Sequence, residues 1–218
     1  GVQTCALPIS MINYRLFGFF ALVLLCAGLP CSGQVLYLEE IESGESEVEV
    51  AVGDIIEVEV HADLGRFSAS GIAFFIAMPC SPFLVVDVGK DEEIRPFSSG
   101  ALFDGSIEAG NTLVYGDTSP HMPNNQQLLS YAAIVGPGAR RGRSGSGAVA
   151  HFTLLCVEPV QDAHIAIRST PIHETRLVLE DGFTERHFSA IQGLEITVAK
   201  ATAVGDETWG SIKAEFVP

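Results

Sequence analysis

The sequence is poor in basic residues and in tryptophan. Its 218 residues contain 12 Lys and Arg against 27 Asp and Glu, which gives a formal net charge of -15, and a single Trp. A surface of that sign repels nucleic acids and anionic membranes, so we exclude both as partners. Hydrophobic residues make up 47% of the chain, which is enough for a full core and excludes a disordered protein.

Motifs of catalysis are also missing. The sequence has no Gly-x-Ser-x-Gly elbow and no His-Glu-x-x-His motif, and its Gly-rich stretch Gly136–Gly147 lacks the Gly-Lys-Ser/Thr ending of a P-loop. We therefore expect a protein that is not an enzyme and that holds no metal of its own. The histidines are dispersed without the spacing of metal ligands on one element: His61, His121, His151, His164, His173 and His187.

The N-terminal region has the pattern of an export signal. Met11 is followed by Arg15, the apolar run Leu16–Leu25 and the small and turn residues Cys26–Gly33. This run is too short for a comfortable membrane span, so we expect cleavage near Gly33 and a secreted or cell-surface product without membrane insertion. The expected organisation is a non-native leader at 1–10, a signal peptide at 11–33, one folded domain at 34–199 and a C-terminal tail at 200–218.

Removal of the signal peptide leaves two cysteines, Cys80 and Cys156. In an oxidising compartment they can form a disulfide, provided that their Cα atoms come within about 7 Å. The alternative is two buried apolar thiols. The sequence leaves both alternatives open.

Apolar residues then alternate with a period of two, which predicts β-strands. In Asp54–Ala62, every second residue from Ile56 is apolar, whereas Glu57, Glu59 and His61 share the other face. In Gly147–Val157 we expect Ala148, Ala150, Phe152, Leu154 and Cys156 to face inward and Val149, His151, Thr153 and Leu155 to face outward. Further strands are expected at Val35–Leu38, Glu47–Val52, Gly71–Met78, Phe83–Val88, Thr112–Tyr115, Leu128–Val135, Ala163–Arg168, Thr175–Leu179 and Leu194–Val198.

Clusters of turn-forming residues separate these segments, for example Glu108–Asn111 and Gly136–Gly138. No segment before Ala199 has a sustained helical stripe of apolar residues. Many short strands with frequent turns predict an all-β protein, an antiparallel two-sheet β-sandwich or jelly roll.

Five segments, in this order, resemble the strands of a cohesin domain, the receptor module of cellulosome scaffolds: Val52–Val60, Ser70–Ile76, Phe83–Val88, Ser146–Leu154 and Gln192–Val198. The resemblance implies a jelly-roll sandwich of about nine strands that docks a dockerin module of another protein, often a polysaccharide-degrading enzyme. Calcium would enter mainly through that dockerin, because this chain has no Asp-x-Asx-x-Asx-Gly loop of its own. Where the family usually has Tyr-Asp-Pro, the chain has Met78–Pro82.

The strand Gly71–Met78 suggests where a partner would bind. If Phe74 faces the core, its neighbours face outward and form a flat apolar patch, which is typical of interfaces. The alternative is that the loop Thr118–Gln127 covers this face. Tyr131 and Ala133, on the strand that neighbours Gly71–Met78 in the cohesin fold, could extend the patch. The expected partner-binding residues are thus Ala73, Phe75, Ala77, Tyr131 and Ala133.

The leading hypothesis is thus an exported docking module for a dockerin-like protein. A carbohydrate-binding module that recognises polysaccharide, or a structural extracellular sandwich, is the alternative, and a hydrolase with an unfamiliar site is a third. The arginines of Gly136–Gly147 belong either to a flexible connection or to a basic contact loop. Trp209, Ile212 and Phe216 have helical spacing, which predicts a docked C-terminal helix or an attachment segment.

Overall fold

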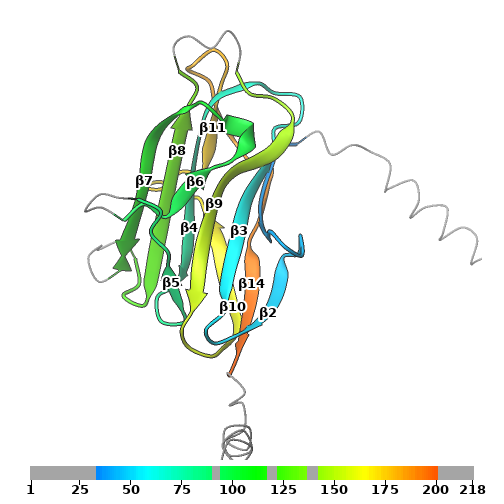
Figure 1. Ribbon diagram of the computed structural model, residues 1–218. Helices are drawn as coiled ribbons and strands as arrows, with labels where there is room; N and C mark the ends of the chain where they lie inside the picture. The colour runs from blue at the N-terminus through cyan, green and yellow to red at the C-terminus, as the bar shows by residue number, and fades with distance from the viewer. Residues whose placement is uncertain (1–32, 90–93, 117–121, 137–141, 201–218) are drawn as a thin grey trace, which may run out of the picture. The chain divides into compact units, whose positions relative to one another are not determined.

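Figure 1 shows the chain as a computed structural model, which describes residues 33–89, 94–116, 122–136 and 142–200. These residues belong to one of two compact units, Gly33–Pro218, whereas the other unit is Gly1–Ser32. The expected signal peptide, the Trp209 tail and much of the arginine-containing loop lie outside the described residues. No helix within the described ranges is long and apolar enough to cross a membrane.

Two β-sheets face each other across a common core, so the predicted all-β two-sheet sandwich is confirmed. In the first, six-stranded sheet, β13, β1, β3 and β9 lie side by side, and β5 and β6 both pair with β9. Its strands are β13 (Ala190–Gln192), β1 (Val35–Glu40), β3 (Ile55–Asp63), β9 (Ser146–Cys156), β5 (Phe83–Val85) and β6 (Phe97–Ser99).

The second sheet has eight strands. β7 pairs with β8, β8 with β4, and β4 with both β10 and β11; β12 follows β11, and β14 and β2 follow β10. Its strands are β7 (Ile107–Tyr115), β8 (Gln126–Ile134), β4 (Ala69–Pro79), β11 (Arg176–Leu179), β12 (Glu185–His187), β10 (Val160–Arg168), β14 (Leu194–Ala199) and β2 (Glu47–Ala51). The pairs β1–β13 and β2–β14 are parallel, and the other strand pairs are antiparallel.

Some elements differ from the sequence prediction. The strands β6, β12 and β13 have three residues each, too few to show an alternating pattern. The predicted turn Glu108–Asn111 lies inside β7, where a register shift between Glu108 and Gly110 accommodates the glycine without ending the strand. A 3₁₀ turn, η1 (Ala101–Phe103), connects β6 to β7.

The core lies between the inner faces of the sheets. As predicted, the apolar residues of β3 from Ile56 to Ala62 are buried. At the centre, the ring centroids of Phe74, Phe97 and Tyr131 lie 5.3 to 5.4 Å apart, and Phe152 lies 5.5 Å from Phe97. Because β4, β6, β8 and β9 contribute these rings, the cluster joins both sheets.

A β-bulge changes the predicted orientation of two neighbouring residues. Val60 pairs with Ala150 but His61 pairs with Ala148, so Val149 is an extra residue on β9. Val149 is therefore buried and Ala148 half-buried, the reverse of the prediction. The residues beyond the bulge follow the prediction, with Phe152 inward and His151 toward the outer face.

Asn111 ties the two sheets together through its side chain. Its Oδ1 accepts a hydrogen bond from Phe97 N (3.0 Å), and its Nδ2 donates to Phe97 O (2.7 Å) and to Glu108 Oε2 (2.9 Å). Phe97 belongs to β6 of the first sheet and Asn111 to β7 of the second. This buried amide therefore fixes β6 against β7.

The structure contains no disulfide between Cys80 and Cys156. Cys156 ends β9 with its side chain in the core, whereas Cys80 follows the end of β4 and is half-buried, with its backbone N–H bonded to Asn125 O. Burial, followed by the nearby Asp54 carboxylate, raises the pKa of the Cys156 thiol to about 11. The alternative of a buried thiol therefore describes Cys156.

Candidate functional site

The outer face of the second sheet is the candidate docking surface, named here the β4–β8 face. Residues that pair directly across antiparallel strands share one side of the sheet. Ala73 pairs with Ala132, Phe75 with Ser130 and Ala77 with Leu128. β7 continues these three rows, and the β4–β8 face consists of Ala73, Phe75, Ala77, Leu128, Ser130, Ala132, Ile134, Gly110, Thr112 and Val114.

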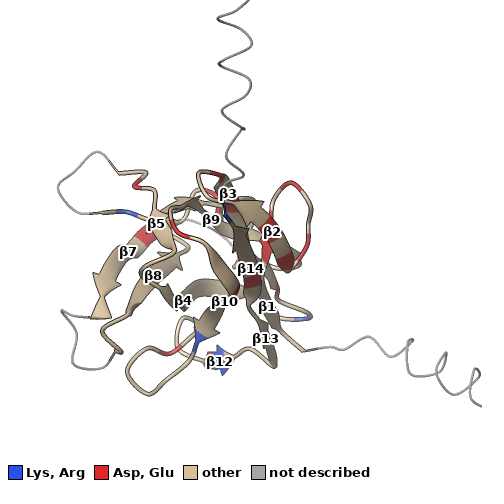
Figure 2. Cartoon of the chain, turned by 90° about the horizontal axis from the view of Figure 1, so that it is seen from below, with Lys and Arg blue, Asp and Glu red and all other residues tan. Residues whose placement is uncertain are grey.

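The β4–β8 face has no charged residue on its two central strands. The 11 residues of β4 and the nine of β8 contain no Asp, Glu, Lys or Arg. Figure 2 shows that acidic residues instead gather around β2 and β14, whereas β4 and β8 carry neither colour. In a chain of net charge -15, the β4–β8 face is thus an uncharged area on an acidic molecule.

Two of the predicted partner-binding residues lie elsewhere. Tyr131 pairs with Phe74, and Ala133 pairs with Ile72, so both face the core and are only 2% and 1% exposed. The Tyr131 hydroxyl lies 3.2 Å from Ser99 Oγ, inside the sandwich. The prediction placed the correct strand beside β4 but assigned the wrong alternate residues to its outer side. Ser130 and Ala132, rather than Tyr131 and Ala133, extend the outer face.

The other three predicted residues are on this face but differ in exposure. Ala73 and Phe75 are half-buried, and Ala77 is only 5% exposed. The His173 ring lies 5.0 Å from the Phe75 ring and covers one side of it. Of the loop expected as the alternative cover, Thr118–Gln127, residues 118–121 lie outside the described residues, and Met122, Pro123 and Gln126 border this end of the face together with residues 170–173.

A groove of about 350 Å³ runs along this covered end. Its lining includes Ala77 and Leu128 of the face, Arg168 at the end of β10, and residues of two loops, among them Met122 and Ile172. At the opposite end the face is open, since Ile134 is 51% exposed. An open apolar area that continues into a groove suits a rigid, largely apolar partner surface.

Polar groups lie both within the face and along its edge. Thr112 Oγ1 and Ser130 Oγ lie 2.7 Å apart, which satisfies both hydroxyls without a charge. Arg176 pairs with Glu174 and, at 3.4 Å, with Glu185, so its charge is balanced locally. The face itself thus carries no charge, and charged residues border it on the neighbouring strands: Arg168 pairs with Phe75 and Arg176 with Ala73.

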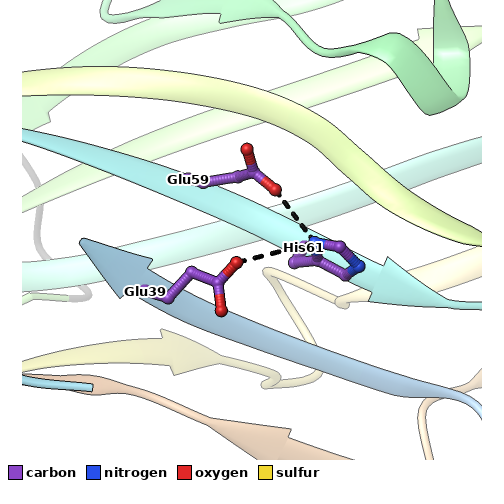
Figure 3. A group of neighbouring side chains, drawn as sticks. All are labelled: Glu39, Glu59 and His61. Atoms are coloured by element: carbon purple, nitrogen blue, oxygen red, sulfur yellow. Dashed lines mark hydrogen bonds and ion pairs between the residues drawn. The ribbon is translucent and has the colours of Figure 1, made fainter. Parts of the chain in front are cut away.

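Among the described residues, one group of side chains could hold a metal ion: Glu39, Glu59 and His61. Figure 3 shows the three side chains converging above β1 and β3, on the outer face of the first sheet. The alternation of residues in Asp54–Ala62 places Glu59 and His61 on one strand face but does not connect them with Glu39 or with His151. The missing information was the pairing of β1 and β9 with β3, which no local pattern shows.

No protein-family model matches the sequence, and no curated protein matches it. Solved structures do match. A type II cohesin domain from the cellulosome of Acetivibrio cellulolyticus is 12% identical with a TM-score of 0.55, over 75% of this chain and 95% of that chain. The type II cohesin A11 from Bacteroides cellulosolvens is 14% identical with a TM-score of 0.53, over 76% of this chain and 99% of that chain.

A third similar structure is the third ScaC cohesin from Acetivibrio cellulolyticus, solved in complex with the ScaB dockerin. It is 11% identical with a TM-score of 0.51, over 76% of this chain and 98% of that chain. At these identities the likeness concerns the fold. The chain has the cohesin fold, as the resemblance of its strand sequences predicted.

Proposed function

We propose that this protein is an exported docking module that binds a dockerin-like module through its β4–β8 face, in extracellular polysaccharide degradation or in cell-surface assembly. The observation that carries the proposal is the absence of charge on β4 and β8 in an acidic protein. Interface centres are depleted of charged residues, whereas an ordinary solvated strand face contains them. One solved cohesin with this fold is in complex with a dockerin.

The shape of the face supports a protein partner over a polysaccharide. Ala73, Ala132 and Gly110 form a row of small residues, so a partner backbone can approach closely. A sugar-binding face needs a row of exposed aromatic rings, but on the β4–β8 face the aromatic residue is Phe75, which His173 partly covers. Carbohydrate binding therefore remains the alternative that the experiment must test.

A matched pair of substitutions tests the face. Ile134, 51% exposed on β8, and Leu84, 54% exposed on β5 of the first sheet, are both large apolar residues at the surface. Immobilised wild-type and variant proteins are offered a panel of dockerin modules, first with calcium and then with a chelator. We expect calcium-dependent binding that Ile134→Asp weakens about 30-fold or more, the size of an interface hot spot, whereas Leu84→Asp leaves it unchanged.

Phe75→Asp and Ala73→Arg place a charge at the centre of the face, and circular dichroism confirms that each variant is folded before binding is compared. Equal affinities of the Ile134→Asp and Leu84→Asp variants would contradict the assigned face. Retention of the protein on insoluble polysaccharide, without capture of any dockerin, would favour the carbohydrate-binding alternative. If the protein binds neither, its likeness to cohesins extends only to the fold.

A further inference from the structure

The outer face of the first sheet carries a second group of polar side chains. The β4–β8 face belongs to the other sheet. Glu39 on β1 pairs directly with Glu59 on β3, and Glu59 pairs on its other side with His151 on β9. His61 lies two residues after Glu59 and therefore on the same face. Three neighbouring strands thus bring two carboxylates and two imidazoles together.

The distances within this group fit a small cation. His61 Nδ1 lies 2.9 Å from Glu59 Oε1 and 3.7 Å from Glu39 Oε1, and one ligand atom from each of these three residues lies within 4.8 Å of the others. Ligand bonds of about 2.0 to 2.1 Å in a tetrahedral zinc site place neighbouring ligand atoms about 3.3 Å apart. The two observed distances lie on either side of that value, so small side-chain rotations would bring the ligands into position.

Two observations separate this group from an ordinary polar surface. Directly opposed like charges destabilise a sheet, yet Glu39 and Glu59 face each other with side chains only 27% and 20% exposed. In addition, His151 Nδ1 is enclosed and has no hydrogen-bond partner, although it lies 3.7 Å from Glu59 Oε2. A cation between the carboxylates would balance their charge and draw Glu59 into a defined orientation beside His151.

The neighbouring Tyr37 supports the same reading. Its ring stacks on the His61 ring, with centroids 4.8 Å apart and an interplanar angle of 23°, and this contact restricts the imidazole. Tyr37 pairs with His61 across β1 and β3, next to the pair Glu39 and Glu59, so the stacking contact holds the imidazole beside the two carboxylates.

We propose that Glu39, Glu59 and His61 form a binding site for a divalent transition-metal ion of the zinc class, with His151 as a positioning residue for Glu59. A mixed set of imidazole and carboxylate ligands suits zinc or cobalt, whereas calcium and magnesium prefer oxygen ligands alone. Because the ligands come from β1 and β3, the bound ion links the two strands on their outer side. The site is independent of the proposed docking function.

The test is isothermal titration of the purified protein, without a polyhistidine tag, with zinc chloride alone, and absorption spectroscopy with cobalt. The control is Glu57→Gln, which removes a carboxylate from the same face of β3, opposite Thr153. We expect one ion per protein chain, an affinity at least 100-fold lower in Glu39→Gln and His61→Gln, and an affinity about 10 to 100-fold lower in His151→Gln. Glu57→Gln and the exposed-site variant His164→Gln should bind as the wild type does.

Thermal unfolding with and without zinc provides a second measurement that does not depend on the titration. Zinc should raise the melting temperature of the wild type and of Glu57→Gln but not of Glu39→Gln. The proposal is overturned if the wild type binds no zinc, if Glu39→Gln and Glu57→Gln bind zinc equally well, or if calcium binds as tightly as zinc.

Discussion

Replacement of Asn111 by Asp tests how the two sheets are joined, because it changes the chemistry of one buried side chain at almost constant shape. The wild-type amide donates two hydrogen bonds, to Phe97 O and to Glu108 Oε2, and accepts one from Phe97 N. An ionised carboxylate keeps only the accepted bond and faces two oxygen atoms at 2.7 and 2.9 Å. We expect Asn111→Asp to destabilise the protein by about 3 to 5 kcal/mol at pH 7, the cost of an unpaired buried charge.

The loss should depend on pH with a defined sign. Burial and the Glu108 carboxylate disfavour the charged form, so the introduced carboxyl has a higher pKa in the folded state than its unfolded value of about 3.9. The part of the destabilisation that comes from the charge is then absent below the unfolded pKa, grows as the pH rises toward the folded pKa and is complete above it. When protonated, the carboxyl again donates one hydrogen bond, which reduces the cost to about 1 kcal/mol.

Urea unfolding followed by circular dichroism at pH 7 and pH 4 measures this difference, with the wild type at each pH as the reference. Asn124→Asp provides the matched control, since Asn124 is exposed and the same substitution there should change the free energy of unfolding by less than about 0.5 kcal/mol. A loss below 1 kcal/mol at pH 7, or the same loss at both pH values, would refute the assigned role of Asn111.

Three further predictions follow from the core and the turns. Phe74→Ala should lower the free energy of unfolding by about 3 to 5 kcal/mol in urea unfolding, since it leaves a cavity beside the rings of Phe97 and Tyr131. Cys156 should resist maleimide at pH 8 in the folded protein and react in urea, because its thiol has a pKa of about 11; a Cys80–Cys156 disulfide found by peptide mapping would contradict this. Hydrogen bonds from the side chain and backbone of Thr184 and from Phe183 N lower the pKa of Asp181. The amides of Phe183 and Thr184 should therefore be protected from hydrogen exchange above the unfolded pKa of Asp181 and lose this protection as the pH falls through its folded pKa. Asp181→Ala should remove the protection at any pH.

The sequence predicted the inner faces of strands that alternate strictly. In β3, apolar and polar residues alternate strictly from Ile56 to Ala62. One side of the strand is therefore apolar and the other polar, and the prediction of the buried side was correct. In β8 the residues around Ser130 are apolar on both sides of the strand, so the pattern does not determine which side is buried. The error at Tyr131 and Ala133 arose there, and only the register with β4 resolves it.

The candidate metal site shows a different limit of sequence reasoning. The Glu59-x-His61 spacing gives two ligands on one strand face, a pattern common to many solvated strands. Glu39 and His151 join them only through the pairing of β1 and β9 with β3, together with a bulge beyond Glu59 that places His61 opposite Ala148. Local periodicity does not show which strands pair with each other or in which register.

The β4–β8 face and the outer side of β1 and β3 have opposite chemistry, and this difference limits how a partner can approach. A partner with an apolar binding surface loses little hydration against β4 and β8, but against β1 and β3 it would bury Glu39 and Glu59, at a cost that no apolar contact offsets. Stacked sheets lie about 10 Å apart, and the core between them is a hydrophobic cluster. The proposed docking face and the proposed metal site can therefore act without interfering with each other, because each would lie on the outer side of a different sheet.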